Sequence, residues 1–254
     1  MTDKLLRLPL DRTKRHFVLG DLHGMYDDLL RLLKVIDYDQ ENDIIYSVGD
    51  LVDRGPKSVE CVEFFTNQKN RYAALGNHEY MSISPMWMNV WYGNGAPQTI
   101  ASLHAHGKDE NWLRDIVSTW PLIIEVGDID EEDCFRIVHA DYDRCFSDDD
   151  AERMLNQATD EDGYFDGEHF EVASLMWSRE TISKGLDNLK TMKPIHYQMD
   201  FNPNRKRHNY VGHSAVRKPL TIRDITFIDT MWFGKKLTMV EVLSGESFSV
   251  KVDV

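Results

Sequence analysis

Three short polar blocks in the first third of the chain each begin where a run of apolar, β-prone residues ends. They read GDLHG at residues 20–24, GDLVDRG at 49–55 and GNHE at 76–79. The runs before them, at 16–20, 43–48 and 71–75, predict three short buried strands. Apolar residues at helical spacing over 25–36 and a helical segment over 58–67 separate these strands. The order predicts a βαβαβ unit, and therefore an α/β fold with a parallel sheet and right-handed crossovers.

The three blocks carry side chains that bind metal ions. In parallel sheets, ligands collect beyond the carboxyl ends of the strands, so residues far apart in the sequence converge there. Asp21 and His23 stand two residues apart, which aims both side chains to one side of an extended segment. The carboxylate of Asp50 has two oxygens and can bridge two ions, and Asn77 adds a neutral amide oxygen. We therefore expect a metal site at this edge of the sheet.

Two later histidines and one arginine extend the pattern. His139 lies in VHAD at 138–141, and His213 lies in GHS at 212–214. Arg54 offers a planar fork of donors that meets two phosphate oxygens at once. Oxygen and imidazole ligands without a thiolate suit manganese, iron or zinc. Two divalent ions lower the pKa of a bound water from about 15.7 towards about 7, so the inventory indicates a two-metal phosphate-ester hydrolase.

The remaining sequence predicts further strands over 122–126, 135–140, 225–229, 237–242 and 248–252, and a helix over 109–117. The close spacing of the last three strands favours antiparallel pairing among them. The Met- and Trp-rich segment 80–92 is typical of a buried core. The sequence has no internal repeat and no domain linker, so we expect a single catalytic domain over residues 1–254.

The composition limits which classes of partner and which cellular compartment fit this chain. A net charge of −14 disfavours nucleic acid, because Lys and Arg neutralise the phosphates in such complexes. No segment approaches the roughly 20 apolar residues of a membrane span, and the charged first 15 residues do not resemble a signal peptide. Three cysteines without a CxxC pair indicate a reducing compartment. We expect a cytoplasmic monomer that contacts neither nucleic acid nor membrane.

Taken together, the blocks resemble the metal-dependent phosphoprotein phosphatases, most closely the bacteriophage lambda-type and bacterial serine/threonine protein phosphatases. The resemblance covers residues 14–243 and includes PLIIE at 121–125, HADY at 139–142, WSRE at 177–180, GHS at 212–214 and IDT at 228–230. It implies the calcineurin-like metallophosphatase fold, in which the βαβαβ core belongs to a two-sheet β-sandwich flanked by helices.

The resemblance also implies an activity, its substrates and a set of roles. Phosphoserine and phosphothreonine monoesters of proteins or peptides would be hydrolysed by direct attack of a metal-bound hydroxide, with phosphotyrosine as a further substrate. Asp21 and His23 would hold the first of two divalent ions, Asp50 would bridge, and Asn77, His139 and His213 would hold the second. Manganese is the expected metal, with iron or zinc as alternatives.

The resemblance assigns four more residues to the chemistry itself. His78 would protonate the leaving alkoxide, and Asp53 would orient this imidazole and raise its pKa so that it stays protonated. Arg54 and Arg179 would grip the phosphoryl oxygens.

Several stretches depart from the family pattern. Residues 196–209 are polar where an apolar strand is expected before His213, and RHNYV at 207–211 predicts a poor buried strand. We expect a surface loop around the basic run 205–207. Residues 148–171 hold ten acidic side chains and one basic one, which predicts a solvated loop or an exposed helix face. Met231 stands where the family commonly has a glycine, so we expect a different loop beside the pocket.

Two other functions fit parts of the sequence. A symmetrical dinucleoside tetraphosphate hydrolase shares the fold and metals, but such relatives tend to lack the acid at position 53 and to end the third block in Asp. Asp53 and Glu79 are both present in this chain. A non-catalytic module that only binds phosphoproteins would be expected to have lost at least one ligand position, and none is missing. The sequence therefore favours a protein phosphatase.

Overall fold

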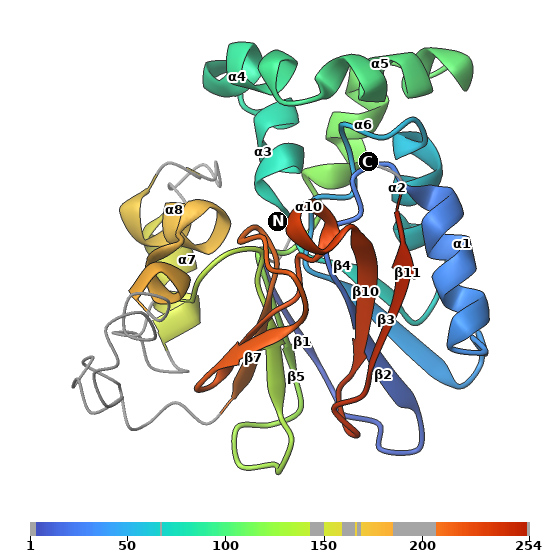
Figure 1. The fold of residues 1–254 in the computed structure, drawn as a ribbon. Helices are drawn as coiled ribbons and strands as arrows, with labels where there is room; N and C mark the ends of the chain where they lie inside the picture. Colours follow the sequence, from blue (N-terminus) through green and yellow to red (C-terminus); the bar gives the residue numbers. More distant parts are fainter. Residues whose placement is uncertain are drawn as a thin grey trace.

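The computed structural model of the chain describes residues 4–66, 68–142, 150–158, 166, 169–184 and 207–252. In this part of the chain, two β-sheets form a central sandwich with helices on its outer sides and at one end (Figure 1). One sheet has six strands in the order β1-β5-β6-β7-β9-β8, and the other has five in the order β11-β10-β2-β3-β4. The predicted two-sheet β-sandwich flanked by helices is confirmed.

The bounds of the elements follow the sequence patterns closely. The six-stranded sheet contains β1 (Leu5–Leu8), β5 (Ile123–Val126), β6 (Phe135–Ile137), β7 (His208–Val211), β8 (Leu220–Ile222) and β9 (Ile225–Phe227). The five-stranded sheet contains β2 (Arg15–Leu19), β3 (Asp43–Ser47), β4 (Arg71–Ala73), β10 (Lys236–Glu241) and β11 (Ser247–Lys251). The helices are α1 (Tyr26–Val35), α2 (Ser58–Thr66), α3 (Asn77–Ile83), the 3₁₀ turn η1 (Pro85–Trp87), α4 (Met88–Gly93), α5 (Ala96–Ala105), α6 (Glu110–Val117), α7 (Asp150–Gln157), α8 (Phe170–Trp177) and α10 (Met231–Gly234).

The predicted βαβαβ unit is present as β2-α1-β3-α2-β4, and its three strands are parallel. Helix α1 buries Leu29, Leu32 and Leu33, which recur at helical spacing, and keeps its charged residues on the other face. Helices α1 and α2 flank the five-stranded sheet, whereas α7 and α8 lie beside the six-stranded sheet (Figure 1). No helix among the described residues is long and apolar enough to cross a membrane.

The predicted pairing of the last three strands is half wrong. Strands β10 and β11 pair antiparallel as expected, but β9 belongs to the other sheet, where it pairs parallel with β7 and antiparallel with β8. Between Phe227 and Lys236 the chain crosses from one sheet to the other through α10. Short-range spacing could not reveal this crossing, because β8 supplies the hairpin partner of β9.

The expectation of a poor buried strand at 207–211 is wrong, and Arg207, placed in the expected surface loop around 205–207, is buried. Residues His208–Val211 form β7, which lies between β6 and β9 in the middle of the six-stranded sheet. Its polar side chains have partners: His208 Nε2 is 2.8 Å from Thr226 Oγ1, and Asn209 Nδ2 donates to Arg207 O at 3.0 Å. Arg207 is itself buried and donates to Gly127 O at 2.8 Å. Residues 196–206 lie outside the described part of the chain.

The Met- and Trp-rich segment is only partly core. Met81 and Trp91 are buried as predicted, but Met86 is 77% exposed and Tyr92 is 49% exposed. The segment folds as α3, η1 and α4 at the end of the sandwich, so one side of it faces solvent (Figure 1). Within the acidic stretch 148–171, residues Asp150–Gln157 form α7 and Phe170 begins α8, and most of the remainder lies outside the described residues.

An aromatic cluster fills the space between the sheets. Phe135 of β6 is fully buried, and its ring centroid lies 5.5 Å from that of Tyr46 on β3 and 6.0 Å from those of Tyr210 and His16. Because these residues come from both sheets, the cluster fixes the spacing of the sandwich.

We expect Phe135→Ala to lower the free energy of unfolding by about 3–5 kcal/mol, because it leaves a cavity between two sheets that cannot collapse onto it. Urea denaturation followed by circular dichroism measures this change. Phe233→Ala is the matched control: Phe233 is 66% exposed, and its loss should change stability by less than about 0.5 kcal/mol. Equal effects of the two substitutions would contradict the assignment of Phe135 to the core.

Candidate metal centre

The polar blocks meet at one edge of the sandwich, beyond the carboxyl ends of the parallel strands. Asp21 and His23 follow β2, Asp50 follows β3, Asn77 and His78 begin α3 after β4, His139 follows β6 and His213 follows β7. All seven residues are at least 92% buried. The six predicted ligands and the predicted acid His78, which come from five separate segments, therefore lie together.

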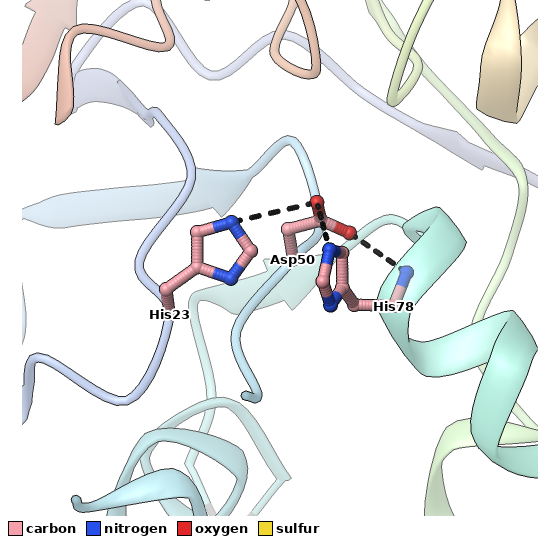
Figure 2. Close-up of side chains that lie close together, drawn as sticks. All are labelled: His23, Asp50 and His78. Atoms are coloured by element: carbon pink, nitrogen blue, oxygen red, sulfur yellow. Dashed lines mark hydrogen bonds and ion pairs between the residues drawn. The ribbon is translucent and has the colours of Figure 1, made fainter. Parts of the chain in front are cut away.

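Asp50 is the centre of this arrangement. Its Oδ2 lies 3.7 Å from His23 Nε2 and 3.9 Å from His78 Nε2, and its Oδ1 lies 3.4 Å from His139 Nε2. Figure 2 shows His23, Asp50 and His78 pointing toward one another from three different segments. Two groups in the described part of the chain have donor atoms within 4.8 Å of one another: His23, Asp50 and His78, and Asp21, Asp50 and His139. Both groups share Asp50, as a bridging carboxylate would.

The amide oxygen of Asn77 joins the remaining ligands to this centre. Asn77 Oδ1 lies 2.8 Å from His139 Nε2 and 3.0 Å from His213 Nδ1. The carboxylate of Asp21 accepts the backbone N–H of His213, with 3.1 Å to Oδ2. All six predicted ligands thus form one connected set.

Hydrogen bonds to the backbone fix two of the imidazole rings. His23 Nδ1 lies 2.9 Å from Val52 O, and His139 Nδ1 lies 2.9 Å from Val48 O. Each Nδ1–H donates to a carbonyl, which directs Nε2 at the centre. This arrangement is typical of metal-binding histidines, because the outer hydrogen bond sets both tautomer and ring orientation.

Several residues of the site have strained backbone conformations. His23, Asp50, Asp53, Arg54 and His213 all have positive φ, between 43° and 71°. Such conformations cost about 1–3 kcal/mol each for residues with side chains and persist only when surrounding contacts enforce them.

The carboxylate of Glu79 enforces the loop that carries Asp50. It accepts the backbone N–H groups of Asp50 at 2.9 Å, Leu51 at 2.8 Å, Val52 at 3.1 Å and Gly76 at 3.1 Å. A side chain at Gly76 is excluded, because a Cβ there would lie 2.4 Å from the Asp50 nitrogen. The sequence analysis considered Glu79 only for the comparison with dinucleotide hydrolases, and this role was not predicted. The signal was present, because Glu79 is the third residue of α3, a position typical of a carboxylate that caps a helix N-terminus.

His78 and Asp53 form a buried pair beside the centre. His78 Nδ1 lies 2.7 Å from Asp53 Oδ2. The Asp53 carboxylate also accepts Trp91 Nε1–H at 3.0 Å and Thr99 Oγ1–H at 2.7 Å. The sequence predicted the pair but missed Trp91 and Thr99, whose contacts to Asp53 span 38 and 46 residues.

Two arginines reach the site from its solvent side. Arg54 donates to His23 Nε2 at 2.5 Å and to His78 Nε2 at 3.0 Å. A metal ion held by His23 would compete with the guanidinium of Arg54 for the same nitrogen. Arg179 is exposed, and its Nη2 donates to His213 O at 3.1 Å. Both predicted phosphate-binding residues therefore contact residues of the candidate site.

The sequence profile of the calcineurin-like phosphoesterase family matches residues 15–232 of the chain. The chain belongs to this family. The phosphoesterase is 25% identical to serine/threonine-protein phosphatase 1 of Salmonella typhimurium, over 90% of this chain and 92% of that protein. It is 35% identical to the symmetrical bis(5'-nucleosyl)-tetraphosphatase of Actinobacillus pleuropneumoniae, over 43% of this chain and 40% of that protein.

Solved structures agree on the fold. A protein serine/threonine phosphatase from Saccharomyces cerevisiae superposes with a TM-score of 0.65 at 14% identity, covering 99% of this chain and 85% of that one. A cold-active protein tyrosine phosphatase superposes with a TM-score of 0.54 at 18% identity, covering 98% of this chain and 82% of that one. The metallophosphatase family predicted from the polar blocks is therefore confirmed, and its sequence relatives divide between two substrate classes.

The electrostatics of the phosphoesterase site favour cations. Burial raises the pKa of Asp21, and the nearby carboxylate of Asp229 raises it further. Burial and the charge of Asp50 raise the pKa of Glu79 to about 7. Burial opposes a charge on His139, but the Asp50 carboxylate outweighs it and raises the pKa of His139 to about 9. So many buried carboxylates repel one another, and a bound cation relieves that repulsion.

Two of the imidazoles are held neutral instead. Burial and the neighbouring His78 lower the pKa of His23 well below its ordinary value, and burial and His139 lower the pKa of His213 to about 3. A neutral imidazole is the form that binds a metal ion. The donors of the phosphoesterase, carboxylate and amide oxygens with imidazole nitrogens, thus fit divalent ions.

Asp229 is a buried acidic residue of the site that the predicted ligand set did not include. It follows β9, and its Oδ1 accepts the backbone N–H of Met231 at 3.2 Å. The sequence signal was present, because IDT at 228–230 belongs to the resemblance, but no ligand pattern singled Asp229 out.

We expect Mn²⁺ at a hundred times its dissociation constant to stabilise the phosphoesterase by about 2.7 kcal/mol, which raises the melting temperature by about 5–10 °C. Asp50→Asn should remove most of this shift, because it weakens the oxygen ligand common to both groups. The exposed Asp115→Asn is the matched control and should keep the full shift. A full shift in Asp50→Asn, measured by differential scanning fluorimetry, would place the metal elsewhere.

Proposed function

We propose that the phosphoesterase is a protein phosphatase that hydrolyses phosphoserine and phosphothreonine monoesters, with phosphotyrosine as a further substrate. The observation that carries this proposal is the buried Asp53–His78 pair, with 2.7 Å between Oδ2 and Nδ1, beside the Asp50 carboxylate. A protein phosphomonoester has an alkoxide leaving group, which needs a proton as it departs. His78 is the residue placed to give it.

In this proposal Asp21 and His23 would hold one divalent ion, Asn77, His139 and His213 would hold a second, and Asp50 would serve both. Bound divalent ions activate the attacking water and neutralise charge on the phosphoryl oxygens. Manganese is the proposed metal, with iron or zinc as alternatives, because the donor set contains oxygen and imidazole nitrogen.

The proposed proton donor depends on its neighbours. Once Arg54 binds the phosphoryl group and no longer donates to Nε2, a protonated His78 gives its Nε2 proton to the leaving oxygen, while its Nδ1–H remains bonded to Asp53. The negative charge of Asp53 stabilises the cationic ring before transfer, and Trp91 and Thr99 hold that carboxylate in place. Proton donation of this kind contributes about 10²–10⁴ in rate.

Two arginines bind the phosphoryl group in this scheme. Arg54 already contacts His78 Nε2 at 3.0 Å, so a phosphoryl group that it binds lies beside the proton donor. Arg179 approaches from the His213 side. Guanidinium forks can each bind two phosphoryl oxygens, which holds the ester in a defined orientation.

A symmetrical dinucleoside tetraphosphate hydrolase is the second candidate. The observation that favours it is the 35% identity to such an enzyme over 111 residues. Asp53 and Glu79, which such relatives tend to lack, favour the protein phosphatase instead. A module that only binds phosphoproteins is disfavoured, because every expected ligand position is occupied by a ligand residue. Partners in the proposal are phosphorylated proteins or peptides, acted on by a cytoplasmic monomer.

The first experiment compares two substrates with metal-stripped protein before and after Mn²⁺ is added. We expect inorganic phosphate to be released from a phosphothreonine peptide only with Mn²⁺. We expect kcat/KM for the peptide to exceed that for a symmetrical dinucleoside tetraphosphate. Cleavage of the dinucleotide with no phosphate from the peptide would establish the second candidate. Release from neither, with metal bound, would favour the binding module.

His78→Asn tests the proton donor. We expect kcat on the phosphothreonine peptide to fall by about 10²–10⁴, and kcat on p-nitrophenyl phosphate to fall much less, because nitrophenolate leaves without a proton. Metal content, measured by atomic emission, should stay at the wild-type level.

The exposed His104→Asn serves as the control and should behave like the wild type. Peptide activity within threefold of the wild type in His78→Asn would refute the proton-donor role. Lost metal would identify His78 as a ligand, in line with its place in the group with His23 and Asp50.

A further inference from the structure

A half-exposed tryptophan stands at the mouth of the site and has no part in the proposed chemistry. Trp232 lies in α10, three residues after Asp229, and remains 51% exposed. The preceding Met231 is only 4% exposed, so the short helix is anchored while Trp232 faces outward. This is where the sequence departs from the family pattern at Met231.

Trp232 is linked directly to the phosphate-binding side of the site. The guanidinium carbon of Arg54 lies 5.3 Å from the centroid of the Trp232 ring, within the range of a cation–π contact. The same guanidinium donates to His23 Nε2 and His78 Nε2. One side chain therefore separates the indole from the metal-binding and proton-donating residues.

The indole has two cationic neighbours and an exposed part. Besides Arg54, Lys235 Nζ lies 5.5 Å from the ring centroid, and Trp232 is 51% exposed. A ligand that combines an anionic phosphoryl group with a flat apolar substituent matches this arrangement. The phosphoryl group would meet Arg54, and the substituent would meet the open part of the indole.

We propose that Trp232 is the specificity residue of this chain and that it contacts the leaving group of aryl phosphate monoesters, such as the ring of a phosphotyrosine side chain. The proposal rests on the proposed function, because it places the scissile phosphoryl group at Arg54. An aryl group offers a face for the indole to pack on, whereas a serine side chain offers one methylene. Trp232 thus favours aryl over alkyl esters.

The test uses two stable phosphonates as competitive inhibitors of p-nitrophenyl phosphate hydrolysis. Phenylphosphonate carries the ring and methylphosphonate does not, and inhibition constants do not depend on the fraction of active protein. We expect Trp232→Ala to raise the inhibition constant of phenylphosphonate about three- to tenfold and that of methylphosphonate less than twofold. Trp232→Phe should restore most of the phenylphosphonate affinity.

The controls separate the outcomes. Phe233→Ala removes a 66% exposed ring next to Trp232 and should change neither constant. Trp232→Leu keeps an apolar side chain but no ring, and it should behave like Trp232→Ala. Agreement between the two variants shows that the effect does not come from loss of the fold in the smaller one. Equal increases for both phosphonates would mean that Trp232 only positions Arg54, and unchanged constants would mean no contact; either result overturns the proposal. Failure to hydrolyse phosphopeptides would refute the proposed function alone, because p-nitrophenyl phosphate reports on any phosphomonoesterase.

Discussion

One buried carboxylate holds the loop on which the site depends. Glu79 accepts three successive N–H groups, from Asp50, Leu51 and Val52, and a fourth from Gly76. The strained conformation of Asp50, with φ 54°, costs about 1–3 kcal/mol, while each of the four hydrogen bonds to Glu79 contributes about 0.5–1.5 kcal/mol. The hydrogen bonds outweigh the strain, so Asp50 keeps a position in which it faces three imidazoles.

The same arrangement concentrates charge where a protein ordinarily avoids it. Asp21, Asp50, Glu79 and Asp229 are all at least 92% buried within one site, and burial raises the pKa of three of them. Such a cluster weakens the fold unless cations balance it. The residues of the site therefore fit bound divalent ions. The same carboxylates that lower the stability of the metal-free protein would provide the affinity for the metal.

Apolar spacing in the sequence predicted the secondary structure in the first third of the chain. The strands and helices around the first three blocks follow from apolar spacing, and the meeting of Asp21, Asp50 and Asn77 follows from the rule for parallel sheets. Strand β7 was missed because a polar side chain such as His208 has a tertiary partner, Thr226, that local sequence does not reveal. Trp91 was predicted to be a core residue from the composition of its segment, and its ring is buried. The hydrogen bond from its Nε1–H to Asp53 was not predicted, because it depends on tertiary packing.

The site divides into a buried part and a rim that differ in tolerance to change. Asp53, held by Trp91 and Thr99, is fully buried, so a substitution there disturbs both packing and the proposed proton transfer. Trp232 is half exposed on a four-residue helix and contacts Arg54 of the site. Under the proposal that Trp232 contacts the leaving group, a new side chain at position 232 alters the surface that a substrate meets and leaves the buried ligand set in place. In that proposal the preference among phosphate esters resides at this rim, because the buried residues would serve every ester alike.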